Sequence, residues 1–197
     1  MSTTRILDQL LDKDTNRYEL VLKVAQRAKQ IEEKGDRLTV SAREIAARVR
    51  EAGLLRPIVD EVENATDALE DCAFFLGIVP ETAVAALAVA PLIRLAEIVT
   101  DCVGKMVRAT EAASRLPHGQ RADAVASLQA IDAVVVAERA ADSAERDAFA
   151  ALMSSAQSDA RALTLGLEIT RALETATDHL SHAALSLRDR VLEELSA

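Results

Sequence analysis

Apolar residues recur every three or four positions along most of the chain, and each such run predicts an amphipathic helix. Glycine and proline separate the runs. Gly53 can close one helix, Pro57 suits the first turn of the next, and a short helix is expected between Pro80 and Pro91. The longer helices are expected at residues 4–13, 17–51, 57–77, 92–116, 121–154 and 158–195. No segment has the pattern of a strand, so the sequence predicts an all-α fold.

The composition agrees with long packed helices and sets limits on function. Half of the 197 residues are apolar, which is ample for a core, and only 2% are aromatic. The formal net charge of −9 argues against a nucleic-acid-binding surface, because phosphate contacts need a basic patch. The same charge permits cation binding. No nucleophile–base pair, glycine-rich phosphate loop or HExxH-type motif is present, so we do not expect an enzyme.

The apolar stretch at residues 72–99 does not predict a membrane span. Glu81 and two prolines interrupt it, and the uninterrupted part is shorter than the roughly 20 residues that a bilayer requires.

Cys72 and Cys102 lie among apolar neighbours and far apart in the sequence, so we expect reduced, buried thiols in a cytoplasmic protein.

Pairs of carboxylates four residues apart recur along the chain. This spacing places both on one helix face, where like charges repel unless something positive lies near them. The five pairs are Glu32/Asp36, Glu63/Asp67, Glu97/Asp101, Glu138/Asp142 and Glu174/Asp178. Glu97 and Asp101 point away from the apolar stripe of their helix and are expected to be solvated. The other four pairs lie on or beside an apolar stripe.

The helix at 121–154 shows this conflict most clearly. The apolar stripe that is expected to be buried consists of Ile131, Val134, Val135, Ala141, Phe149 and Leu152. Glu138, Asp142 and Glu145 fall on the same stripe, because the steps 131–135–138–142–145–149 are all threes and fours. Two explanations are open. Arginines such as Arg43, Arg139, Arg146 and Arg171 could neutralise the acids, or a cation that prefers oxygen ligands (Fe, Mn or Mg) could do so. Both explanations concern the four pairs that lie on or beside an apolar stripe.

The acidic pairs also follow a pattern of two and two. Glu32 and Glu63 are 31 residues apart and Glu138 and Glu174 are 36 apart, which suggests an internal duplication with a break near Pro80. His182 extends the series Glu174–Asp178–His182, but we expect it to be a surface side chain. His118 lies in LPHGQ, residues 116–120, which predicts a loop.

Four motifs follow one another from about residue 20 onward: QIEEKGDRL, PIVDEVENATDALEDCAFFLGI, IDAVVVAERAADSAERDAF and ALETATDHLSHAALSLRDRVLEE. In order and spacing they resemble the PhoU-like family known as DUF47, the accessory proteins of Pit-type phosphate transporters. The resemblance implies one PhoU-like domain over residues 1–197, built from two pseudo-symmetric three-helix bundles of long antiparallel helices with halves at about 1–79 and 80–197.

The same resemblance implies a function. It predicts regulation of inorganic phosphate transport, with a Pit-type phosphate transporter or its regulator as partner and no nucleic acid. Membrane association would be peripheral and only through that partner, and a homo-oligomer is possible. The family's Glu/Asp-x-x-x-Asp signatures are associated with metal clusters. Carried over to this chain, they imply metal ligands at Glu32, Asp36, Glu63, Asp67, Glu138, Asp142, Glu174 and Asp178.

A second resemblance concerns the N-terminal part alone. The stretch NRYELVLKVAQRAKQI, followed by LTVSAREIAARV, is similar to the core of the bacterial RNA polymerase omega subunit over residues 16–49. This implies an alternative function, in which the chain is a helical interaction module that docks on the largest subunit of the polymerase through that segment.

Overall fold

The structure, a computed structural model, is all-α in the part of the chain that it describes. The described residues are 34, 36–41, 52–80, 83, 87–115, 121–155 and 159–196. The long helices are α3 (Ala52–Gly77), α5 (Val89–Ala113), α6 (Arg121–Ser155) and α7 (Ala160–Ser196). Residues 36–41 are also helical. The predicted fold class and the long antiparallel helices are confirmed.

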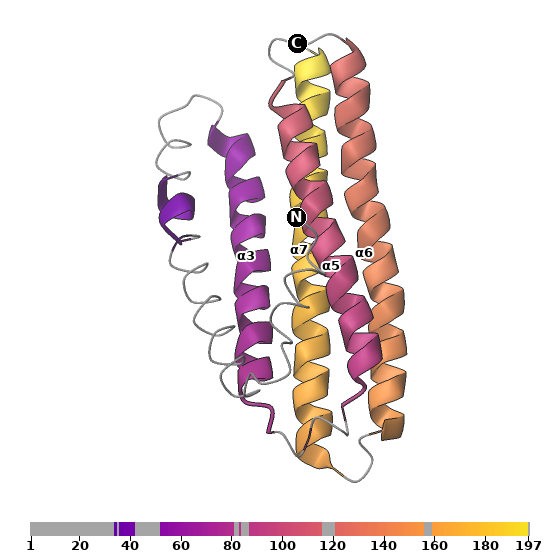
Figure 1. Ribbon diagram of the computed structural model, residues 1–197. Coiled ribbons are helices and arrows are strands. Elements are labelled where there is room, and N and C mark those ends of the chain that lie inside the picture. The colour runs from indigo at the N-terminus through magenta and orange to yellow at the C-terminus, as the bar shows by residue number, and fades with distance from the viewer. Residues whose placement is uncertain are drawn as a thin grey trace, which may run out of the picture.

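The four long helices pack side by side in one bundle. Successive helices run in opposite directions, with α3 and α6 pointing one way and α5 and α7 the other (Figure 1). Helix α7 packs against α3, α5 and α6, and α5 also packs against α6. The PhoU-like division into two three-helix bundles is therefore not confirmed. Much of the predicted first half lies outside the described residues, so the domain division stays a prediction.

The helix ends lie within a few residues of the predicted ones, and prolines account for the largest differences. Helix α5 begins at Val89, so Pro91 lies in its first turn, where a missing N–H removes no helical hydrogen bond. Helix α3 begins at Ala52, so Pro57 lies inside it and not at its first position. Asp159 caps the start of α7, because its Oδ1 accepts hydrogen bonds from two first-turn backbone N–H groups, at 2.9 and 3.0 Å.

The core between the helices is built largely from alanine. On α6 the buried positions are Ala124, Ser127, Ile131, Val134, Ala137, Ala141, Ala144, Ala148 and Leu152. They face α5 and α7, where Leu95, Ile169 and Val191 are almost fully buried. Small side chains at the contact allow helices to approach closely, and this explains how a chain with few aromatic residues fills its interior.

The two cysteines are buried, as predicted, and neither forms a disulfide. They lie in different parts of the core: Cys72 packs with Leu92 and Leu95, whereas Cys102 packs with Ile131 and Val134. Burial raises the pKa of each thiol to about 11.

Within the described ranges, no helix is long and apolar enough to cross a bilayer. A cytoplasmic location stays a prediction.

Candidate functional site

Four of the eight predicted metal ligands come together between α6 and α7. Glu138 and Asp142 of α6 and Asp178 of α7 each offer an oxygen within 4.8 Å of the others. Glu174, one turn before Asp178 on α7, shares a side-chain hydrogen bond with it. We call these four residues the acidic seam. Two acidic pairs that are far apart in sequence therefore form one cluster, because α6 and α7 pack along each other.

Crowding in the acidic seam favours protonated carboxyl groups. Burial, the charge of Asp178 and the charge of Glu145 raise the pKa of Glu174 to about 7. Burial and the charges of Asp142 and Asp178 also raise the pKa of Glu138. A carboxyl–carboxylate hydrogen bond such as that between Glu174 and Asp178 needs one proton between its two partners. Protons therefore supply part of the neutralisation that was expected from a metal ion or from arginine.

Partial exposure to solvent and one arginine reduce the remaining repulsion between the carboxylates of the seam. The seam residues are half-buried at the edge of the α6–α7 contact, so their oxygens can be hydrated. Arg146 contacts Asp142 at 3.5 Å, and both side chains are partly exposed, so this pair contributes little. Arg171 instead contacts Glu168 of its own helix, at 3.3 Å. The expectation that α6 directs acids into its core is thus corrected: they lie at the rim.

The other predicted ligands do not join the seam. Asp67 of α3 is exposed and Glu63 is half-buried, and neither belongs to a group of three possible metal ligands within the described ranges. Asp36 is exposed, and Glu32 lies outside the described residues. Glu97 and Asp101, which were expected to be solvated, are both exposed. Asp101 contacts Lys105 at 2.6 Å.

Metal binding by the acidic seam stays a prediction, and it has a direct test. Added Mn²⁺ should raise the melting temperature of the native chain by mass action, and more at pH 8 than at pH 6, because the ion competes with the shared protons. Replacing Glu138 and Asp142 by alanine should remove this response. Calorimetry with Mg²⁺, Mn²⁺ and Fe²⁺ measures it, and a native chain whose melting ignores all three ions would contradict the hypothesis.

A second group of possible ligands lies between α3 and α7. Glu61 Oε2 is 2.7 Å from His179 Nδ1 and 3.9 Å from His182 Nδ1. His182 was predicted to be a surface side chain, and it is 60% exposed. Glu61 and His179 were missed altogether. The available signal was the three-residue spacing of the two histidines, which places both rings on one face of α7.

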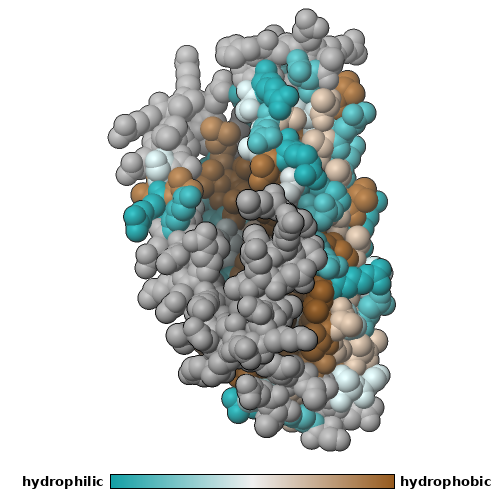
Figure 2. All heavy atoms as spheres, in the orientation of Figure 1, coloured by the Kyte–Doolittle hydropathy of each residue, from teal (hydrophilic) through white to brown (hydrophobic). Residues whose placement is uncertain are grey.

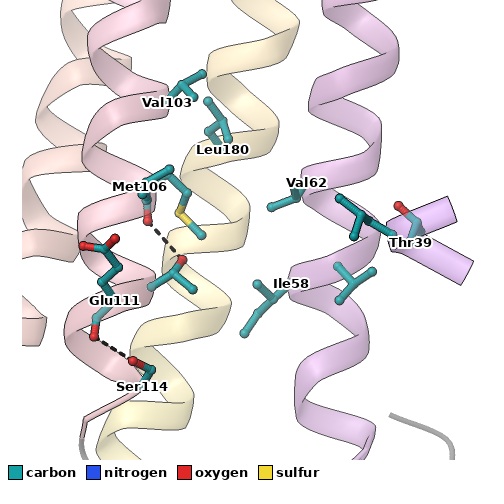
Figure 3. A pocket seen from close by; sticks show the side chains of 12 residues that line it. Thr39, Ile58, Val62, Val103, Met106, Glu111, Ser114 and Leu180 are labelled. Carbon is teal, nitrogen blue, oxygen red and sulfur yellow. Dashed lines mark hydrogen bonds between the residues drawn. The ribbon is translucent and has the colours of Figure 1, made fainter. Parts of the chain in front are cut away.

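An apolar pocket of about 540 Å³ opens between α3 and α5. Figure 2 shows hydrophobic surface gathered in this hollow. Ile58 and Val62 of α3 face Met106 of α5 across the pocket, and Leu180 of α7 lies between these helices (Figure 3). Thr39, from the helical stretch at 36–41, also lines it. The pocket therefore lies at the junction between the N-terminal part of the described chain and the bundle.

Comparison with known families gives one match. The model of the RNA polymerase Rpb6 family matches residues 9–70, roughly a third of the chain. No curated protein and no solved structure matches the chain. The matched range contains the omega-like stretch at 16–49 and continues through most of α3, so it includes Glu61 and one wall of the apolar pocket.

This match corrects the main functional prediction. The DUF47 resemblance was wrong, and with it the predicted role in phosphate transport and the predicted transporter partner. The prediction that the chain has no nucleic-acid partner is contradicted as well, because the matched family belongs to RNA polymerase, which binds nucleic acid. The physical reason for the error is plain: carboxylates four residues apart beside an apolar stripe fit any acidic amphipathic helix. The omega-like alternative is the better-supported reading.

Proposed function

We propose that this chain is an interaction module that associates with RNA polymerase through residues 9–70. The match of this segment to the RNA polymerase Rpb6 family carries the proposal. The proposed role is binding and not catalysis, in keeping with a sequence that has no nucleophile–base motif. Helices α5 to α7 are then a platform that the segment brings to the polymerase.

The distribution of charge fits such a division of labour. The matched range 9–70 has eleven Lys and Arg against thirteen Asp and Glu, a balance of −2, but its acids gather in α3 and residues 13–56 have a balance of +4. The rest of the chain, outside 9–70, has twelve against nineteen, a balance of −7. Long-range electrostatics would turn the positive segment toward an acidic partner surface. The acidic bundle would turn away from the nucleic acid that the polymerase holds.

Packing links the proposed docking segment to the bundle. Residues 52–70, the end of the matched range, lie in α3, and α3 packs along α7. The bundle would therefore stay close to the polymerase surface. The described part of the segment also offers apolar surface for binding, since Leu38 is 61% exposed and Val40 is 55% exposed.

The test is association of the purified full-length chain with RNA polymerase core enzyme from the same organism. We expect the native chain to co-elute with the core enzyme in size-exclusion chromatography. Val40→Asp should weaken binding about tenfold or more, because it places a charge in an apolar contact. The dissociation constant, measured by biolayer interferometry, gives the size of the effect.

Helix α6 offers a matched control. Val136 is 60% exposed, similar to Val40, and lies outside the matched segment, so Val136→Asp should leave the affinity unchanged. Circular dichroism verifies that both variants keep the helical content of the native chain. A native chain that does not bind the core enzyme contradicts the proposal. Equal affinities for native chain and Val40→Asp would contradict the assigned surface.

A further inference from the structure

The contact between α3 and α7 holds two imidazoles and one carboxylate that face one another. Glu61 comes from the middle of α3, whereas His179 and His182 come from one face of α7. The side chains of Glu61 and His179 are each 28% exposed and that of His182 is 60% exposed. The group is thus anchored on its inner side and reachable by a solvated ion on its outer side.

A simple hydrogen bond explains only part of this arrangement. Glu61 Oε2 and His179 Nδ1, 2.7 Å apart, make a good hydrogen bond. His182 Nδ1 faces the same oxygen at 3.9 Å, which is too long for a hydrogen bond. The two rings stand edge to face with centroids 6.3 Å apart, so both present a nitrogen to the space beside Glu61.

The distances suit a small ion after modest side-chain rotation. One ligand atom from each of the three residues lies within 4.8 Å of the others. Tetrahedral zinc, bound at about 2.0–2.2 Å, holds its ligand atoms about 3.4 Å apart. Glu61 Oε2 must therefore move about 0.7 Å away from His179 Nδ1 and about 0.5 Å closer to His182 Nδ1. Rotation about the outer bonds of Glu61 and of His182, the most exposed of the three side chains, can make both changes without moving either helix.

The surroundings favour a cation at this place. Burial and the charges of Asp142 and Asp178 raise the pKa of Glu138, and His182 offsets part of this rise, so the acidic seam lies close enough to act on this group. Asp178, a seam residue, precedes His179 in the chain. Several carboxylates therefore create a negative potential beside the imidazoles, and this potential favours a cation there.

We propose that Glu61, His179 and His182 bind a divalent transition-metal ion of the zinc class and join α3 to α7. Two imidazoles and a carboxylate suit Zn²⁺ or Co²⁺ and leave a coordination position for water. The ion would fix the end of the residue 9–70 segment to the C-terminal helix. This site is independent of the proposed polymerase association, and it differs from the predicted seam site in its ligands.

The experiment uses the full-length chain, stripped with chelator and dialysed. Titration with Co²⁺ should produce the visible absorption of a site with nitrogen and oxygen ligands, at one ion per chain, and Zn²⁺ should displace the cobalt. Zn²⁺ should also raise the melting temperature. Glu61→Gln and His182→Ala should each weaken Co²⁺ binding tenfold or more. His182 is largely exposed, so its loss leaves the fold intact.

Two controls separate this site from other sources of binding. His118→Ala removes the remaining histidine of the chain, and Asp67→Asn removes an exposed carboxylate of α3; both should bind Co²⁺ like the native chain. The proposal is overturned if the native chain shows neither a cobalt spectrum nor a zinc-induced melting shift. It is equally overturned if Glu61→Gln and His182→Ala bind normally, or if only Glu138→Gln with Asp142→Asn abolishes binding.

Discussion

Replacing Leu95 by alanine is expected to lower the free energy of unfolding by about 2–5 kcal/mol. Leu95 is fully buried, and its α5 side chain packs in the core cluster that includes Ala144 of α6 and Ile169 of α7. Its truncation removes apolar contacts and leaves a cavity that the neighbouring alanines are too short to fill. Urea denaturation followed by circular dichroism measures the change.

Ile93 is the matched control for this prediction. It lies two residues before Leu95 on the same helix and is 54% exposed, so Ile93→Ala should change the free energy of unfolding by about 0.5 kcal/mol or less. If the two variants were equally stable, Leu95 would not be buried between the helices and the packing of α5 in the bundle would be wrong.

Replacing Glu174 by glutamine is expected to stabilise the protein at pH 8 by about 1 kcal/mol, allowing for the partial exposure of the carboxyl group. Burial and the neighbouring charges of Asp178 and Glu145 raise the pKa of Glu174 from 4.5 to about 7. Ionisation in the folded protein is therefore unfavourable. Glutamine has a similar shape and no charge, so it removes this penalty. For a chain of this length, the gain corresponds to a rise of about 2–4 °C in melting temperature.

The sign of the pH dependence follows from the same pKa. Between about pH 4.5 and pH 7, the folded protein holds a proton on Glu174 that the unfolded chain releases. The contribution of this residue to stability is therefore greatest at the acidic end of that range and is lost as the pH rises to 7. Melting of Glu174→Gln between pH 5 and pH 8 should show a flatter profile than the native chain. Glu193→Gln, at an exposed position of α7, should keep the native profile.

Hydrophobic periodicity was enough to predict the four long helices that the structure describes, and local chemistry explains the differences at their ends. The predicted helix at 4–13 and most of that at 17–51 lie outside the described residues. The predicted 121–154 differs by one residue from α6, because both ends of that pattern are marked by loop residues. Helix α5 begins three residues before the predicted start, because proline was read as a boundary although the first turn accepts it. Periodicity alone did not specify how the helices pack into one bundle.

The buried face of α6 was predicted only in part. Ile131, Val134, Ala141 and Leu152 are buried as expected, whereas the acids that were placed on the same stripe lie one residue beyond it. The acids at 138, 142 and 145 each follow a buried alanine directly, at 137, 141 and 144. One residue is a rotation of about 100° around a helix, which moves a side chain from the core to its rim. Phe149, the largest residue of the expected stripe, is 47% exposed. A helix wheel weighted toward large side chains overlooks a core made of small ones.

The candidate sites were foreseen to different degrees for a physical reason. Acids repeated within one helix can be read from their spacing, and the two pairs of the acidic seam did converge. The group formed by Glu61, His179 and His182 could not be read from spacing in this way. Glu61 and His179 are 118 positions apart, so only the packing of α3 against α7 brings them together. The family error has the same origin, since short-range spacing is common to many helical proteins.

The two buried thiols can report on local opening of the bundle through the rates at which they are alkylated. With a pKa of about 11, a thiol has almost no thiolate at neutral pH, and burial keeps reagents away from it. Alkylation of native protein must therefore wait for local opening. Cys72 and Cys102 belong to different core clusters. The ratio of their labelling rates under native conditions would thus reveal whether the bundle opens as one cooperative unit or yields first at one end.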